Sequence, residues 1–186
     1  MGPQLHSGIP RDAERVVLVD ERNRPVGSEE KLRAHQEGGK LHRAFSVFIF
    51  DSQGRLMLQR RALGKYHFAG LWTNACCGHP RVDEDVLEAA HRRLMEEMGF
   101  DAPLNEAFTL LYREADPVSG LTEHELDHVL LGTYDCDPCP NPHEVSAWRW
   151  AQREELTQDL EARPEFYTPW FAIIFRRLVR EELCHG

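Results

Sequence analysis

The sequence predicts a mixed α/β domain in which a β-sheet containing parallel and antiparallel strands lies between helices. Two observations carry this expectation. Predicted strands and helices are interspersed along the chain, which is typical of packed layers of both kinds. The length of 186 residues suits one domain, and no repeat, low-complexity segment or long linker divides it. We therefore expect a flexible tail over residues 1–14 and a single domain over residues 15–186.

The N-terminal part is predicted to contain a strand, a turn and a helix. The apolar run at 15–20 indicates a short buried strand. A turn through Asn23 and Pro25 follows it. The polar and acidic run Ser28-Glu29-Glu30 is typical of a helix start, and Gly38-Gly39 marks the end of this helix.

The next segment is predicted to form a hairpin. The run at 44–50 is strongly apolar, and the run at 56–59 returns after the turn residues Asp51-Ser52-Gln53-Gly54. A loop containing Gly64 and Gly70 then leads toward a helix over about 84–98.

That helix has clear signals at both ends. Asp83 is the expected N-cap, and Glu84 and Glu88 suit the positive N-terminal end of the helix dipole. Gly99 is a natural stop, because glycine adopts the left-handed conformation that ends many helices.

The C-terminal part is predicted to hold three strands and two helices. Apolar runs indicate strands at 107–113, 124–135 and 144–150. Helical periodicity covers 152–161 and 169–183.

Composition and charge argue against several classes of partner and location. The chain is 41% hydrophobic and 28% charged, as in globular domains, and its net charge of -9 argues against nucleic-acid binding. The N-terminus has no apolar core typical of a secretory signal, and no apolar run approaches a membrane span. The five cysteines form an odd number, so we expect a reducing cytoplasm. Cys136 and Cys139 have CxxC spacing but lack the second pair of a structural zinc site.

Residues 78–100 resemble the Nudix box, a loop-helix-loop that holds a diphosphate through divalent metal. The fixed positions that match are Gly78, Glu84, Arg92, Leu94, Glu96, Glu97, Gly99 and Phe100. One position differs, because Arg93 replaces a glutamate that helps to assemble the metal cluster for hydrolysis in that family. A guanidinium cannot bind a metal, but it can bind phosphate oxygens. We therefore expect diphosphate binding without hydrolysis.

Further motifs make the resemblance more specific. The chain carries Trp72-Thr73-Asn74-Ala75-Cys76-Cys77-Gly78-His79-Pro80 beside the altered box, together with Leu41 to Ser46, Arg60-Arg61-Ala62, Tyr112-Arg113 and Glu123-His124-Glu125. From about Val16 to Ile174, it resembles type I isopentenyl-diphosphate isomerase, which has a Nudix fold. That family interconverts isopentenyl and dimethylallyl diphosphate by protonating and deprotonating carbon.

The resemblance implies a set of catalytic residues. Cys77 and Glu125 would act on opposite faces of the allylic unit, with Glu125 on the protonating side. Tyr112 matches the tyrosine that hydrogen-bonds this glutamate. Trp170 matches an aromatic residue that faces the carbocation, although a tryptophan on such a helix would otherwise be assigned to the core.

The resemblance also implies two metal sites and a diphosphate site. One divalent ion, Mn²⁺, Zn²⁺ or Mg²⁺, would be bound by His35, His42, His79, Glu123 and Glu125. A Mg²⁺ ion would arrive with the substrate and bind Glu97 and the backbone carbonyl of Cys77. The cations expected around the diphosphate are Lys31, Arg61, Lys65 and Arg93. We expect the remaining histidines His6, His67, His91, His143 and His185 to be solvated or structural.

Three other functions are compatible with parts of the sequence. An active Nudix diphosphohydrolase with an altered box is the nearest, and Arg93 argues against it. The run from His124 to His128 fits the metalloprotease pattern H-E-x-x-H, but that chemistry needs a helix and the flanking residues predict a strand. An inactive binding module is expected to lack Cys77 or Glu125, and both are present. The partner that we expect is therefore a small isoprenyl diphosphate, bound by a monomer.

Overall fold

The computed structural model describes residues 14–182. The strands are β1 (Arg15–Val19), β2 (Pro25–Glu30), β3 (His42–Phe50), β4 (Leu56–Arg61), β5 (Trp72–Thr73), β6 (Cys76–Gly78), β7 (Leu104–Ala115), β8 (Thr122–Thr133) and β9 (Val145–Ala151). The helices are α1 (Lys31–His35), α2 (Val86–Met98), α3 (Arg153–Ala162), a 3-10 turn at Pro164–Phe166, and α4 (Pro169–Arg180). The predicted tail lies outside the described residues, except for Glu14.

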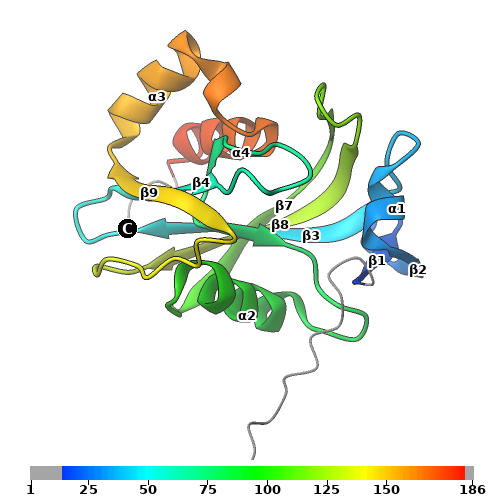
Figure 1. The fold of residues 1–186 in the computed structure, drawn as a ribbon. Coiled ribbons are helices and arrows are strands. Elements are labelled where there is room, and N and C mark those ends of the chain that lie inside the picture. Colours follow the sequence, from blue (N-terminus) through cyan, green and yellow to red (C-terminus); the bar gives the residue numbers. More distant parts are fainter. Residues whose placement is uncertain (1–13, 183–186) are drawn as a thin grey trace, which may run out of the picture.

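The sheet is organised around β3 and contains parallel and antiparallel strands, as predicted. This strand pairs in parallel with β8 and antiparallel with β6, while β7 extends the sheet antiparallel to β8. Helix α2 covers one face of the sheet, and α3 and α4 cover the other (Figure 1). Within residues 14–182, we find no helix with the length and apolar character needed to cross a membrane.

Both faces of β3 are buried, which explains its continuous apolar sequence. Successive side chains of a strand point to opposite faces. Phe45, Val47 and Ile49 pack in the core beneath α2, whereas Phe48 and Phe50 pack in the core beneath α4. Two hydrophobic cores therefore hold this strand in a fixed register, and the functional residues at its start inherit that register.

The helix predicted to start at Ser28 is shorter than expected. Ser28 and Glu29 belong to β2, where they pair with Val17 and Val16 of β1. Glu30 is the N-cap of α1, and its carboxylate accepts hydrogen bonds from the backbone of Leu32 and Arg33. Strand pairing with β1 therefore overrides the local helix-start signal.

Helix α2 begins two residues later than predicted and ends where predicted. Asp85 is the N-cap, whereas Asp83 has a φ of 67° and lies in the preceding turn. Gly99 ends the helix with a φ of 75°, as predicted.

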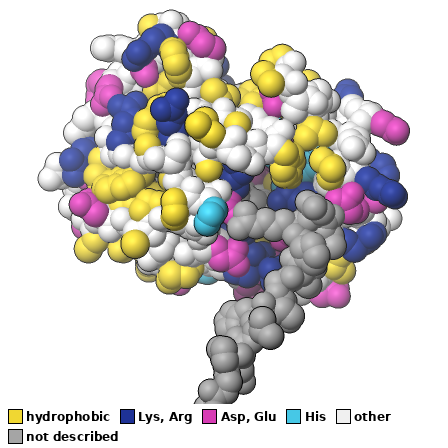
Figure 2. Space-filling view, viewed as in Figure 1, with side chains coloured by type: hydrophobic (Ala, Val, Ile, Leu, Met, Phe, Trp, Pro, Cys, Tyr) yellow, Lys and Arg dark blue, Asp and Glu magenta, His cyan; other side chains and the backbone are white. Residues whose placement is uncertain are grey.

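The surface in Figure 2 carries a mixture of side chains. Acidic and basic groups are interspersed there with hydrophobic ones. Several large hydrophobic residues are well exposed, among them Leu63, Tyr66 and Val118.

Candidate active site

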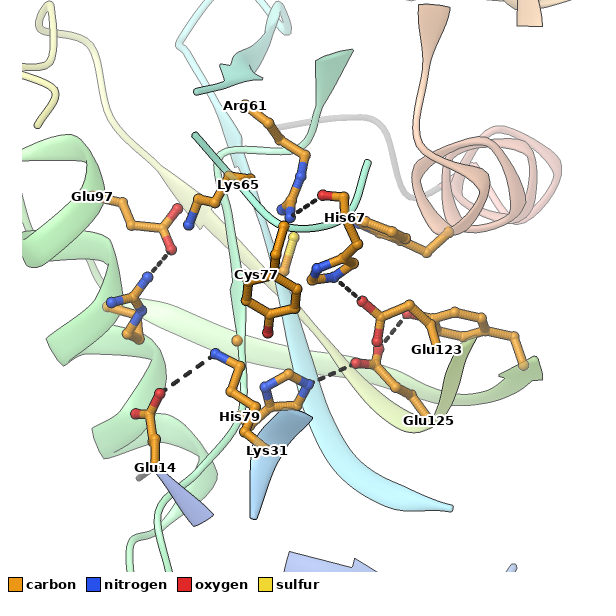
Figure 3. A pocket seen from close by; sticks show the side chains of 15 residues that line it. Glu14, Lys31, Arg61, Lys65, His67, Cys77, His79, Glu97, Glu123 and Glu125 are labelled. Carbon is orange, nitrogen blue, oxygen red and sulfur yellow. Dashed lines mark hydrogen bonds and ion pairs between the residues drawn. The ribbon is translucent and has the colours of Figure 1, made fainter. Parts of the chain in front are cut away.

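Most of the predicted site residues line one pocket. The loop between β4 and β5, the short strand β6, the inner face of β8 and helix α2 surround it (Figure 3). The predicted residues that line it are Lys31, Arg61, Lys65, Cys77, His79, Arg93, Glu97, Tyr112, Glu123, Glu125 and Trp170. His35 and His42 are fully buried next to the pocket and contact its carboxylates.

Strand register brings these residues together. Glu125 of β8 pairs with His42 of β3 on one side and with Tyr112 of β7 on the other. Cys77 of β6 pairs with Ser46 of β3, four residues along the same strand from His42. The sheet therefore places the thiol and the carboxylate on neighbouring strands that flank β3.

Five side chains converge as a metal-binding group. His35, His42, His79, Glu123 and Glu125 each offer one ligand atom, and these atoms all lie within 4.8 Å of one another. The Nε2 atom of His35 lies 2.8 Å from Glu123 Oε2, and the Nε2 atom of His79 lies 2.8 Å from Glu125 Oε1. The Nε2 atoms of His42 and His79 face each other at 3.1 Å.

Backbone contacts fix the orientation of two of these imidazoles. Nδ1 of His35 lies 2.6 Å from the carbonyl of Lys31, and Nδ1 of His42 lies 2.8 Å from the carbonyl of Lys40. Because a carbonyl can only accept a hydrogen bond, each Nδ1 carries the proton. The Nε2 atom of each ring is then the one that faces the cluster and can bind a metal. These donors fit a divalent ion.

The ionisation of the group also suits a cation. Burial alone would raise the pKa of Glu123, but His35 and His67 lower it well below its ordinary value. Burial and the neighbouring His42 lower the pKa of His79 well below its ordinary value, so this imidazole is neutral. An ionised carboxylate and a neutral imidazole are the protonation states that bind metal. At His35 burial acts to lower the pKa, but the adjacent Glu123 outweighs it and raises the pKa above its ordinary value, so a bound metal would have to displace that proton.

Cys77 and Glu125 have environments that favour their protonated forms. Burial raises the pKa of Cys77 to about 12, although Arg61 acts in the opposite direction. Burial and the charge of Glu123 raise the pKa of Glu125. The hydroxyl of Tyr112 donates a hydrogen bond to Glu125 Oε2, as expected, and burial raises the pKa of Tyr112 well above its ordinary value.

Four cations line the same pocket. Lys31 lies 3.4 Å from Glu14, and Lys65 contacts Glu144. The Arg61 side chain donates to the carbonyls of Phe68 and His67, at 3.1 Å each. Arg93 contacts Glu97 one helical turn later. These contacts hold the four charges near the pocket, and their action on a diphosphate stays a prediction.

Glu97 lies at the base of this cationic region. It is 4% exposed, and its Oε2 atom accepts a hydrogen bond of 2.8 Å from the amide of Gln59. The same amide donates to the carbonyl of Ala75 at 2.8 Å. Gln59 therefore links Glu97 to the strand segment that carries Cys77, and we did not predict this link.

Trp170 belongs to both the pocket and the core. It lies in the first turn of α4, is 3% exposed, and lines the pocket. The guanidinium carbon of Arg61 lies 5.5 Å from the centroid of its ring, and Phe68 packs edge-on against it at 5.2 Å. Arg61 thus contacts the aromatic ring of Trp170, which the resemblance predicts to face the carbocation.

The zinc-protease pattern is excluded by geometry. His124 and His128 lie on strand β8, as the flanking residues predicted. Nδ1 of His124 lies 3.1 Å from the Gly39 carbonyl, whereas Nε2 of His128 lies 3.0 Å from the side-chain nitrogen of Asn23. They therefore do not form the one-turn pair that such a site needs.

Sequence reasoning missed three pocket residues. His67 was expected to be solvated or structural. It is 7% exposed and its Nε2 contacts Oε1 of Glu123, so the expectation of a solvated side chain was wrong. Glu14 and Tyr66 also line the pocket. No spacing in the sequence marks these residues, because a loop and a chain terminus bring them to the site.

Of the other cysteines within residues 14–182, none lines the pocket. Cys76 is fully buried among apolar residues, as expected for a small hydrophobic side chain. Cys136 and Cys139 are exposed free thiols, and Cys184 lies outside the described residues.

Comparison with known proteins agrees with this geometry. Residues 40–171 match the model of the NUDIX domain. The chain is 52% identical over 173 residues to isopentenyl-diphosphate Delta-isomerase 2 of Aromatoleum aromaticum, covering 93% of this chain and 90% of that relative. It is 50% identical over 170 residues to isopentenyl-diphosphate Delta-isomerase of Serratia proteamaculans, covering 91% and 94% of the two chains.

A solved structure confirms the predicted fold. A Deinococcus radiodurans protein superposes with a TM-score of 0.74 at 24% identity, covering 88% of this chain and 98% of that one. The Nudix fold and the histidine and glutamate cluster together indicate divalent-metal binding. The chain belongs to the isopentenyl-diphosphate Delta-isomerase family of NUDIX-domain proteins.

Proposed function

We propose that Cys77 and Glu125 carry out the allylic isomerisation of isopentenyl diphosphate to dimethylallyl diphosphate in this chain. The observation that carries the proposal is their placement. Both line one pocket, on strands that flank β3, and Glu125 is only 6% exposed. Such burial excludes the water that would trap a carbocation.

The reaction needs one proton delivered and another removed. Glu125 in its protonated form donates a proton to the terminal methylene carbon of the alkene, which leaves positive charge on the tertiary carbon. The CH2 carbon bonded to the tertiary carbon on the diphosphate side then loses a proton. The electron pair of that C–H bond forms the new double bond. Cys77 as a thiolate accepts that proton, and proton return to Glu125 completes the cycle.

The raised pKa values bear on how the cycle starts. In protein without metal, burial and Glu123 raise the pKa of Glu125, which favours the acid form that protonation of an alkene requires. Cys77 must lose its proton before it can act as a base, and its pKa of about 12 opposes this. Arg61 acts to lower that pKa. A cation brought to the Cys77 carbonyl with the substrate would act in the same sense.

Positive charge at the tertiary carbon needs stabilisation. Trp170 lines the pocket, and an indole face attracts a cation. Tyr112 is buried beside Glu125, where its hydroxyl orients the carboxylate. We propose that Trp170 stabilises the carbocation and that Tyr112 orients the carboxyl group of Glu125.

The diphosphate anchors the small reacting group. Lys31, Arg61, Lys65 and Arg93 line the pocket and would bind the diphosphate oxygens. Glu97 and the Cys77 carbonyl would hold the Mg²⁺ that accompanies it. Binding energy at the diphosphate orients the five-carbon tail between Cys77 and Glu125.

The five-residue cluster would hold the second ion. Its three imidazoles and two carboxylates suit Mn²⁺, Zn²⁺ or Mg²⁺, and no thiolate is among them. When bound, the ion adds positive charge beside Glu125 and lowers the cost of its ionised form. The cytoplasmic location and the monomeric state stay predictions.

Turnover in deuterium oxide tests the proposal. The dimethylallyl product is expected to carry deuterium in a methyl group, because the proton delivered to the methylene carbon comes from an exchangeable group. Nuclear magnetic resonance of the product measures this label. Product without deuterium after one turnover would show that the hydrogen moves within the substrate, and Glu125 would then not be the acid.

A further inference from the structure

Glu144 is a buried carboxylate beside the diphosphate end of the pocket. It immediately precedes β9 and is 2% exposed. Its Oε2 atom contacts the ammonium of Lys65 and lies 3.6 Å from the NH2 atom of Arg93. It is absent from the pocket lining, so it reaches the site through these two cations.

The two cations belong to different parts of the fold. Lys65 lies in the loop between β4 and β5, and Arg93 lies on α2. Their side chains are 20% and 19% exposed, so water screens their mutual repulsion only in part. A carboxylate that contacts both reduces this repulsion and fixes both charges in one place.

The backbone on either side of Glu144 is tied to the same two parts. Its carbonyl accepts a hydrogen bond of 3.0 Å from Ala62, at the start of the Lys65 loop. Its amide donates to Asn141 at 2.9 Å, and the Asn141 amide donates to the carbonyl of Glu97 at 2.9 Å. The carboxylate therefore has a rigid support that spans the loop and the end of α2.

We propose that Glu144 is a positioning residue that sets Lys65 and Arg93 for the diphosphate. The inference rests on the proposed function, since it assumes that these two cations bind the substrate. Glu144 is not among the residues that line the pocket with Cys77 and Glu125. Its effect is therefore expected on binding of the diphosphate and not on proton transfer.

Two physical effects compete at this position. The negative charge of Glu144 repels an incoming diphosphate, which weakens binding. The same charge holds two cations in place before binding, which saves the cost of ordering two long side chains. The close contact with Lys65 and the rigid backbone indicate that the second effect is larger.

Titration calorimetry of inorganic pyrophosphate with Mg²⁺ tests the proposal. Replacement Glu144→Gln is expected to weaken binding about 10-fold, the scale seen when a supporting hydrogen-bond partner is removed. KM for isopentenyl diphosphate should rise by a similar factor, while kcat stays nearly constant. The matched control is Glu155→Gln, which removes a 50% exposed carboxylate paired with Arg149 on the surface.

A double replacement separates positioning from a general structural role. In a Lys65→Met background, Glu144→Gln should cost much less than it does alone, because its main partner is already gone. Should Glu144→Gln fold poorly, Glu144→Asp keeps the charge on a shorter side chain, and an intermediate loss of affinity is expected.

The outcomes distinguish the positioning role of Glu144 from the assignment of the diphosphate site. Unchanged or tighter pyrophosphate binding in folded Glu144→Gln overturns the positioning role. Equal losses in the wild-type and Lys65→Met backgrounds also overturn it. If Lys65→Met itself leaves pyrophosphate affinity unchanged, the diphosphate site has been assigned to the wrong cations, and the inference fails with it.

Discussion

The Nε2 atom of His79 lies 2.8 Å from the Oε1 atom of Glu125. The other oxygen of Glu125 accepts a hydrogen bond from Tyr112. One oxygen thus belongs to the metal-binding group, whereas the other faces a neutral hydroxyl. This division would let a single carboxylate serve as a ligand and as an acid, the two roles that we propose for Glu125.

Replacement Glu125→Gln should separate these two functions. The amide keeps an oxygen for the ion but has no acidic proton. General acid catalysis is worth about 10²- to 10⁴-fold in rate, so kcat should fall by at least that factor. Elemental analysis should still find one tightly bound divalent ion. A variant that keeps its metal and isomerises at a near-normal rate would leave Glu125 as a ligand only.

Replacement His42→Ala should have the opposite pattern. It removes one of the three imidazoles, so the metal is lost first and activity falls as a consequence. Excess divalent metal in the assay should restore part of the activity. Failure of any metal concentration to restore activity, in folded protein, would point to a role for His42 beyond metal binding.

The neighbouring cysteines should differ sharply. Cys77→Ala should abolish turnover and leave folding and metal content nearly intact, since Cys77 is proposed to move a proton. Cys76 is fully buried in the core beneath α2, so Cys76→Ala should lower the free energy of unfolding by about 1 kcal/mol with activity kept. Kinetics and chemical denaturation of both variants measure this difference. Equal losses of activity would show that the thiols are assigned wrongly.

The pKa of Cys77 predicts an unusual pH dependence of alkylation in metal-free protein. Alkylation needs the thiolate, and a pKa of about 12 keeps the thiolate rare at neutral pH. The rate of iodoacetamide labelling should therefore keep rising roughly tenfold per pH unit between about pH 8 and 11. The exposed Cys136 is the control for the reactivity of the reagent in the same samples. Peptide mass spectrometry resolves the sites, and early levelling at Cys77 would contradict the raised pKa.

Restoring the consensus glutamate by Arg93→Glu should not create a hydrolase. The change removes the cation that contacts Glu96 and Glu97 and lies near Glu144, so several carboxylates would repel one another. We expect a loss of about 3 kcal/mol in the free energy of unfolding and weaker pyrophosphate binding. Phosphate release from isopentenyl diphosphate should stay at background. Robust hydrolysis would show that Arg93 alone disables that reaction.

Local pattern accounts for much of the fold. Apolar runs located β3, β4, β7, β8 and β9, and Gly99 marked the end of α2, because these signals depend on nearby residues. Strand β2 was missed, since its residues Pro25–Glu30 are polar and form a strand only through pairing with β1. The short strands β5 and β6 likewise depend on distant partners.

The family resemblance predicted residues that the structure brings together, among them Cys77, Glu125 and the metal-binding group. Glu123 and Glu125 are two residues apart on a strand and so share a face, which spacing reveals. His67, Gln59 and Glu144 escaped prediction because a loop, a hydrogen bond and a backbone link bring them to the site. Such contacts depend on the tertiary packing of segments that no local pattern relates.

The most direct measurement is the conversion of isopentenyl diphosphate by purified protein with Mg²⁺, followed by product analysis. The account predicts acid-labile dimethylallyl diphosphate, no release of phosphate, and no requirement for flavin, nicotinamide or nucleotide. Release of phosphate without the allylic isomer would contradict the account, as would isomerisation that appears only when reduced flavin is added.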